Sequence, residues 1–218
     1  MFTGFSQETF DFLWGIRFNN TKEWFTENKQ IYTKYVKEPM DGLASAVLRQ
    51  MTEKHEPLLV SHVSRIIKDA RYAHGEKYRD RLWFSLGQRK EEMPLAPAFY
   101  FEISPEGYAY GMGYYKAPAR TMAAFRKKVD ANQEEFLIIA NELISRGRFS
   151  LYGDKYKKKK GDKIGPVSDF YERKNIGLIA ERPIGRELFC TEICSIIVDG
   201  FVTLLPLYRF LQSIEQEN

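Results

Sequence analysis

Cysteine and histidine are scarce in the 218-residue chain, and their scarcity excludes several classes of protein. Two cysteines, Cys190 and Cys194, are too few to staple a chain of this length, so we expect buried, reduced thiols. The three histidines, His55, His62 and His74, have neither the helical nor the cysteine-paired spacing of a metal site. The sequence therefore predicts no metal centre, and no motif in it calls for a cofactor.

Long apolar runs, a leader sequence and catalytic loops are also lacking. No apolar run approaches the roughly 20 residues of a membrane span, and residues 1–10 lack the cationic-then-apolar pattern of a signal peptide. We therefore expect a cytoplasmic protein with no membrane partner. No phosphate-binding loop or nucleophile–histidine spacing is present. Any catalysis would depend on arginine, lysine, tyrosine, asparagine or aspartate, so the sequence leaves open whether the protein is an enzyme.

Apolar residues make up 44% of the chain and aromatic residues 15%, which is ample for a packed core. Apolar side chains recur every three to four residues in the first fifty positions, with Ser6 and Thr21 as candidate N-caps. Between residues 58 and 115 the period changes to two. We predict a single α+β domain over residues 1–218, with helices packed on an antiparallel or mixed sheet of about five or more strands.

Individual elements follow from the same patterns. Strands are predicted at 82–86, 99–103, 108–115 and 176–180, with a turn at 104–107 that makes the second and third a hairpin. A helix is predicted at 133–146. The apolar helical stretch at 187–214 contains Gly200 and Pro206, and these should bend or divide it.

The net charge of +4 conceals clustering. Segment 65–90 has eight basic and three acidic residues, segment 120–128 has four basic and no acidic residues, and segment 155–163 has six lysines and one aspartate. Positive charge is therefore concentrated in the middle of the chain, where an anionic partner is expected.

The octet from Arg65 to Tyr72 is the most informative part of these segments. As a strand, it would put Arg65, Asp69 and Arg71 on one face. Asp69 either pairs with both arginines as a structural ion cluster, or orients one while the other binds an anion through its fork of donors. Gly111 and Gly113 share a face without side chains, which allows a helix or a ligand to approach the backbone. The residues of the candidate anion-binding site are Arg65, Lys68, Asp69, Arg71, Tyr72, Tyr78, Arg79 and Arg126, with Gly111 and Gly113 as close-approach positions.

Three functions remain open on this basis. The first is binding of, or action on, a small phosphate- or carboxylate-bearing ligand in a cleft lined by arginine, lysine and tyrosine. The second is nucleic-acid binding, which requires segments 65–90, 120–128 and 155–163 to share one surface. The third is a structural or interaction protein without a small-molecule site. The lysine run at 155–160 by itself is typical of a solvated, mobile loop, and the oligomeric state stays open.

Three blocks of residues resemble a bacterial family. The first block contains Asn19, Asn20, Glu23, Trp24, Phe25, Asn28, Lys29 and Tyr32; the second contains Arg65, Ile66, Lys68, Asp69, Arg71 and Tyr72; the third contains Gly111, Gly113, Tyr115 and Arg126. In this order they resemble the signatures of domain of unknown function 2461, over about residues 2–211. Here Ala73 stands where the family usually has serine, and Glu76-Lys77-Tyr78-Arg79 is one residue shorter than its usual counterpart and lacks its proline. The resemblance implies a single α+β domain of about this length and assigns no catalytic residue; we expect Asn19 and Asn20 to cap helices by accepting backbone N–H bonds.

Overall fold

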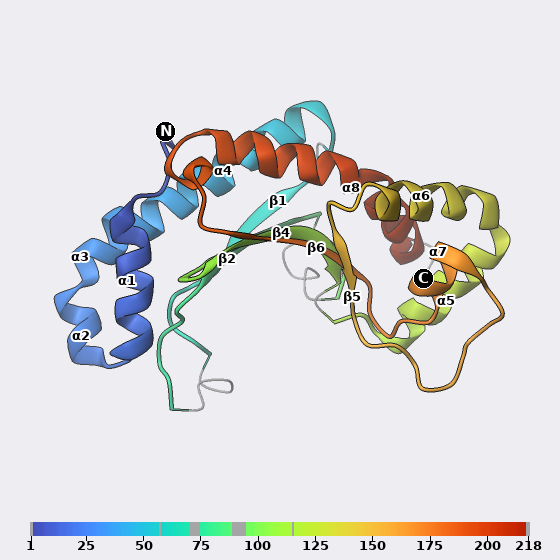
Figure 1. Ribbon diagram of the computed structural model, residues 1–218, viewed down its shortest axis with the longest axis horizontal. Coiled ribbons are helices and arrows are strands. Elements are labelled where there is room, and N and C mark those ends of the chain that lie inside the picture. Colours follow the sequence, from blue (N-terminus) through green and yellow to red (C-terminus); the bar gives the residue numbers. More distant parts are fainter. Residues whose placement is uncertain (1, 57, 70–74, 89–94, 115, 217–218) are drawn as a thin grey trace. The chain divides into compact units, whose positions relative to one another are not determined.

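A computed structural model describes residues 2–56, 58–69, 75–88, 95–114 and 116–216 (Figure 1). Arg71 and Tyr72 of the candidate site, and Arg89 and Lys90 of the first basic segment, lie outside the described residues.

Helices form the N-terminal quarter of the chain and recur after the sheet. Ser6 is the N-cap of the first, and the Thr21 hydroxyl caps the second by accepting the Trp24 backbone N–H (3.2 Å), which confirms both predicted caps. In chain order the helices are α1 (Gln7–Phe18), α2 (Lys22–Glu27), α3 (Lys29–Ile31), the π-helix η1 (Tyr32–Lys37), α4 (Glu38–Lys54), α5 (Ala119–Ala131), α6 (Gln133–Ser145), α7 (Gly165–Tyr171), the 3₁₀-helix η3 (Arg186–Phe189) and α8 (Glu192–Gln216).

One six-stranded antiparallel sheet confirms the predicted α+β fold. Its order is β1-β2-β3-β4-β6-β5, so the first four strands follow one another along the chain and β5 lies at the edge beyond β6. The predicted turn at residues 104–107 joins β3 to β4, because proline and glycine there end one strand and start the next. The strands are β1 (Val60–Val63), β2 (Leu82–Gly87), β3 (Pro97–Ser104), β4 (Gly107–Tyr114), β5 (Ser150–Tyr152) and β6 (Gly177–Pro183).

The chain forms two compact units, each with its own apolar core. Unit 1 comprises Met1–Leu86, Tyr100–Ala109 and Glu181–Asp199, and unit 2 comprises Gly87–Phe99, Tyr110–Ala180 and Gly200–Asn218. In unit 1 the ring of Phe101 packs on Phe84 (5.4 Å) and on Phe5 (6.4 Å). In unit 2 the rings that pack against one another are those of Phe99 and Phe201, and of Phe125, Phe136, Phe170 and Phe210.

Helix α8 runs undivided through Gly200 and Pro206, so of the two predicted outcomes, a bend or a division, the division is wrong. A Cβ atom at Gly200 would lie 2.5 Å from the Tyr110 ring, so glycine serves packing against β4 there and not a helix end. Within the described residues, Glu192–Ile214 is also long and apolar enough to cross a membrane by composition (mean hydropathy 1.6). This is weak support for a span, because 61% of that window is buried, as in the core helix of a soluble protein.

Candidate functional site

The segment that carries Arg65 and Asp69 pairs with the segment that carries Tyr78 and Arg79. The Lys68 N–H donates to the Lys77 carbonyl (2.9 Å), and the Arg79 N–H donates to the Ile66 carbonyl (2.7 Å). Burial alternates along the segment as the sequence predicted for a strand, although the pairing amounts to an isolated bridge between Ile67 and Tyr78. Arg65, Ile67 and Asp69 are exposed, whereas Ile66 is buried, so the face with Arg65 and Asp69 lies on the solvent side.

Two further candidates on these paired segments, which we call the ladder of unit 1, already have partners within the fold. The Lys68 side chain is one-fifth exposed, and its ammonium forms an ion pair with Glu76. The Tyr78 ring is buried and stacks on Phe25, with ring centroids 4.4 Å apart. Lys68 and Tyr78 therefore stabilise the ladder, and a ligand would have to displace these contacts to use them.

Arg79 differs from these neighbours. It is half-buried, and its Nε has no exposed surface and no hydrogen-bond partner among the described residues. Glu102 on β3 lies near enough for the Arg79 charge to act on it: burial raises the pKa of Glu102, and Arg81 and, more weakly, Arg79 oppose that rise.

A cleft of about 460 Å³ lies on unit 1, and no motif in the sequence pointed to it. Its charged lining comprises three glutamates and two arginines, so acidic groups outnumber basic ones. Glu102 is paired with Arg81 (3.3 Å), and Glu106 is paired with Arg17. The balance of charge disfavours an anion here. The lining residues are Arg81, Glu102, Ser104, Glu106, Gly107, Tyr108, Ala109, Glu181, Arg182 and Pro183.

The remaining candidates, Arg126, Gly111 and Gly113, belong to unit 2. The two glycines are on β4, and the backbone that approaches them is that of β6. A Cβ atom would lie 2.0 Å from the Leu178 carbonyl oxygen at Gly111 and 2.5 Å from the Gly177 Cα at Gly113. Close approach of a strand, and not of a helix or ligand, accounts for these two positions.

Arg126 lies on α5, with its guanidinium over the ring of Tyr156 (5.3 Å to the centroid). The Lys160 ammonium lies 4.4 Å from the same centroid. The Arg126 Nη1 has no exposed surface and no hydrogen-bond partner among the described residues. An unsatisfied buried donor costs about 1–3 kcal/mol, and more when it is charged, so this nitrogen favours an incoming acceptor.

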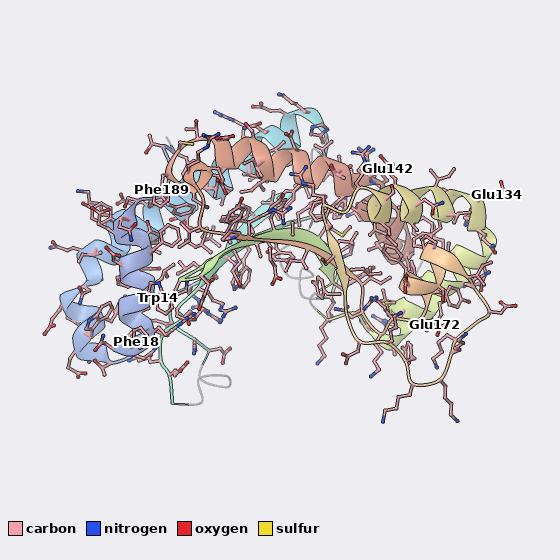
Figure 2. The ribbon with its side chains drawn as sticks, in the orientation of Figure 1. Trp14, Phe18, Glu134, Glu142, Glu172 and Phe189 are labelled. Atoms are coloured by element: carbon pink, nitrogen blue, oxygen red, sulfur yellow. The ribbon has the colours of Figure 1, made fainter. Side chains whose placement is uncertain are left out.

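Tyr156 and Lys160 belong to a loop, residues 155–163, which we call the basic loop. Glu172, at the end of α7, is buried and holds its centre: the carboxylate accepts the backbone N–H groups of Lys160 (2.8 Å) and Gly161 (3.2 Å). The Glu172 carbonyl also accepts the Tyr156 N–H (2.8 Å). Figure 2 labels Glu172 on unit 2. A single glutamate thus fixes the loop at three backbone positions.

Both ends of the basic loop are fixed by ion pairs. Lys155 pairs with Asp169 (2.9 Å), and Lys163 pairs with Asp130 on α5 (2.8 Å). Asp130 also accepts the Tyr171 hydroxyl (2.9 Å). The hydrogen bond from Lys163, followed by that from Tyr171, lowers the pKa of Asp130, whereas burial and Asp130 raise the pKa of Tyr171 to about 12. The loop that sequence alone suggested to be mobile is thus held at 155, 156, 160, 161 and 163.

Charge separates between the two units. Unit 2 has 18 lysines and arginines and 12 aspartates and glutamates, for a net charge of +6. Unit 1 has 15 and 17, for a net charge of −2. Two of the three basic segments, 120–128 and 155–163, meet in unit 2 through Arg126 and Tyr156. The described part of segment 65–90 belongs almost wholly to unit 1.

No group of three or more histidine, cysteine, aspartate or glutamate side chains suited to a metal occurs in the described part of the chain. Cys190 and Cys194 are both free thiols; the predicted burial is confirmed for Cys194 and wrong for Cys190, which is half-buried. Burial raises the pKa of the Cys194 thiol, which disfavours its reactive thiolate form.

Comparison with known proteins identifies a family and nothing narrower. No curated protein matches the chain. The model of the family described as conserved hypothetical protein (DUF2461) matches residues 8–210, nearly the whole chain. The chain, with its six-stranded sheet, its helices and the three blocks of signature residues, belongs to the DUF2461 family.

Proposed function

We propose that the protein binds a small anionic ligand through a phosphate or carboxylate group at Arg126 of unit 2. The observation that carries the proposal is the buried Nη1 of Arg126, which has no acceptor among the described residues. Guanidinium donors pair most strongly with carboxylate and phosphate oxygens. Lys160, next to the same tyrosine ring, adds a second positive charge.

The surroundings support binding at this position over binding at the ladder of unit 1. Tyr156 holds the Arg126 guanidinium from one side, which reduces the side-chain freedom lost when a ligand binds. Arg65, by contrast, is exposed, and Lys68 already has Glu76 as its partner. Arg126 is the charged candidate of unit 2, and it shares the Tyr156 ring with a second cation, Lys160.

The test is thermal unfolding of the protein with increasing inorganic phosphate, at constant ionic strength. A ligand that binds only the folded state raises its stability by RT ln(1 + [L]/Kd), or about 2.7 kcal/mol at a concentration of 100 Kd. We expect the wild-type midpoint to rise with phosphate, the Arg126→Ala midpoint to stay constant and the Arg126→Lys midpoint to rise less, because lysine lacks the planar fork.

Arg146→Ala is the matched control. Arg146 is an exposed arginine of the same unit, paired with Glu142 (2.6 Å), and it lies outside segments 120–128 and 155–163. Its removal changes net charge equally and should leave the phosphate effect intact. An equal phosphate response in wild type and Arg126→Ala would overturn the proposal.

A further inference from the structure

We infer that the surface around Arg126 takes the phosphodiester backbone of a nucleic acid, read without regard to base sequence. This inference rests on the proposed function, since it names the class of ligand that supplies the anionic group. Two observations support it. Several lysines of the basic loop have no partner among the described residues, and two cations lie over the ring of Tyr156.

The tip of the basic loop presents lysines that no carboxylate of the described residues pairs with. Lys157, Lys158 and Lys159 are exposed and have no ion pair or hydrogen bond from their side chains among the described residues. Lys155 and Lys163, which flank them, are both paired. The loop therefore uses its outer lysines as anchors and leaves its three central lysines to solvent.

The three lysines differ from those of an unrestrained loop, because hydrogen bonds hold the backbone on both sides of them. Glu172 holds Tyr156, Lys160 and Gly161, the residues immediately before and after the three free lysines. Less conformational entropy is therefore lost when the three lysines meet a partner than in an unrestrained tail. The hydrogen bonds of the buried carboxylate therefore hold the backbone next to these three lysines in place.

The charge extends beyond what one small ligand can neutralise. Arg120 and Lys127 on α5 are exposed and likewise unpaired among the described residues, and they lie two helical turns apart, about 10 Å along the axis. α5 meets the loop through Arg126 and Tyr156. A row of separated cations matches a polymer with regularly spaced phosphates better than a single phosphate group.

The aromatic group at this surface argues against base recognition. Arg126 and Lys160 both lie over the Tyr156 ring, so two cations already compete with a base for stacking on it. Contacts to phosphates position a protein on nucleic acid but do not distinguish sequences. Binding should therefore depend strongly on salt and little on base composition.

The experiment is fluorescence anisotropy with a labelled 20-nucleotide single strand, a 20-base-pair duplex and polyglutamate of matched charge, each over a series of KCl concentrations. The variant replaces Lys157, Lys158 and Lys159 with alanine. The matched control replaces Lys22, Lys29 and Lys54 of unit 1, which are exposed and unpaired among the described residues.

We expect the loop variant to lose about two units of the salt slope, d log K/d log[KCl], on the single strand, because three phosphate contacts contribute about −0.7 each. The control variant should retain the wild-type slope, and strands of different sequence should bind alike. Equal losses in the two variants, or equal binding of polyglutamate and nucleic acid, would overturn the inference.

The phosphate titration separates this inference from the proposed function. If inorganic phosphate raises the unfolding midpoint of the wild type but the wild type binds no nucleic acid at low salt, the proposed function stands and the inference fails. If strands bind through the loop lysines while phosphate has no effect at Arg126, the small-ligand proposal fails instead.

Discussion

The side-chain amide of Asn20 makes both backbone hydrogen bonds of Tyr78: its Oδ1 accepts the Tyr78 N–H (2.8 Å), and its Nδ2 donates to the Tyr78 carbonyl (2.9 Å). The amide thus takes the place of a neighbouring strand for one residue. Phe25, from the same signature block, stacks on the Tyr78 ring. The first block of the family signature therefore positions the segment that follows the second.

Replacing Asn20 with alanine should lower the free energy of unfolding by about 2–3 kcal/mol, because two part-buried backbone groups lose their partners. Urea unfolding measures this directly. Asn19→Ala is the comparison: Asn19 makes one exposed bond to the Gly15 carbonyl (3.0 Å) and should cost about 1 kcal/mol or less. A loss from Asn20→Ala no larger than from Asn19→Ala would contradict the assignment.

Asn20 also shows where the sequence stopped being informative. The pattern marked Asn19 and Asn20 as caps that accept backbone N–H groups, but Asn19 is the C-cap of α1 and donates its Nδ2, and Asn20 caps no helix. The partner of Asn20 lies 58 residues away, and no local pattern encodes a pairing at that distance. The strands at 82–86 and 99–103 were predictable because runs of aromatic residues, with a proline–glycine turn after the second, are local signals.

The site was predictable to a similar degree. Clustered charge identified segments 120–128 and 155–163, which contain Arg126 and the lysines, because the basic residues of each segment lie close together in the sequence. Glu172, which orders the lysine loop, is a single glutamate without any motif, and only tertiary structure shows its role. Gly200 does not end the helix for a similar reason, because its contact with Tyr110 outweighs the low helix propensity of glycine.

Arg17 governs the titration of Glu106. Its hydrogen bond to this carboxylate, the largest effect, lowers the pKa of Glu106 to about 2. Arg17→Met should return that pKa toward its usual value of about 4.3. Carbon-13 NMR titration of the Glu106 carboxyl group measures the change. A value that remains near 2 in the variant would show that Arg17 is not the cause.

The same contact predicts a dependence of stability on pH. Because the pKa of Glu106 is lower in the folded state, its contribution is present above about pH 4.5 and is lost as the pH falls toward 2. Glu106 is 57% exposed, so solvent screening limits this contribution to about 1 kcal/mol or less. The stability difference between wild type and Arg17→Met should therefore shrink between pH 5 and pH 2 in urea unfolding.

Gly111 and Gly42 should respond to alanine in opposite directions. At Gly111 a methyl group would lie 2.0 Å from the Leu178 carbonyl oxygen, so β4 and β6 must separate locally, at a cost of about 2–3 kcal/mol. At Gly42, inside α4, the nearest atom would lie 3.5 Å away, and helix propensity favours alanine by up to about 1 kcal/mol. Thermal unfolding of both variants tests the pair. A Gly111→Ala protein as stable as wild type would show that the two strands tolerate the extra atom.

Glu172 should control access to the basic loop. Glu172→Ala removes the carboxylate that accepts the Lys160 and Gly161 N–H groups, so the loop should open more often. Bonds to a charged acceptor contribute about 1.5–3 kcal/mol each, and 1.4 kcal/mol corresponds to a tenfold change. Limited trypsin digestion should then cleave after residues 157–160 at least about tenfold faster than in wild type, because cleavage follows the population of the open state.

Two comparisons make this result specific to the loop. Glu142→Ala, on the exposed face of α6 (Figure 2), breaks only the pair with Arg146 and should leave cleavage of the loop unchanged. Glu172→Gln keeps a carbonyl acceptor and should accelerate cleavage less than alanine. If Glu172→Ala also accelerated cleavage after Lys54 in unit 1 to the same extent, global unfolding would be the cause. If the loop opens alone and the same variant binds the nucleic-acid strand more weakly, the buried carboxylate is what holds the three free lysines in position for binding.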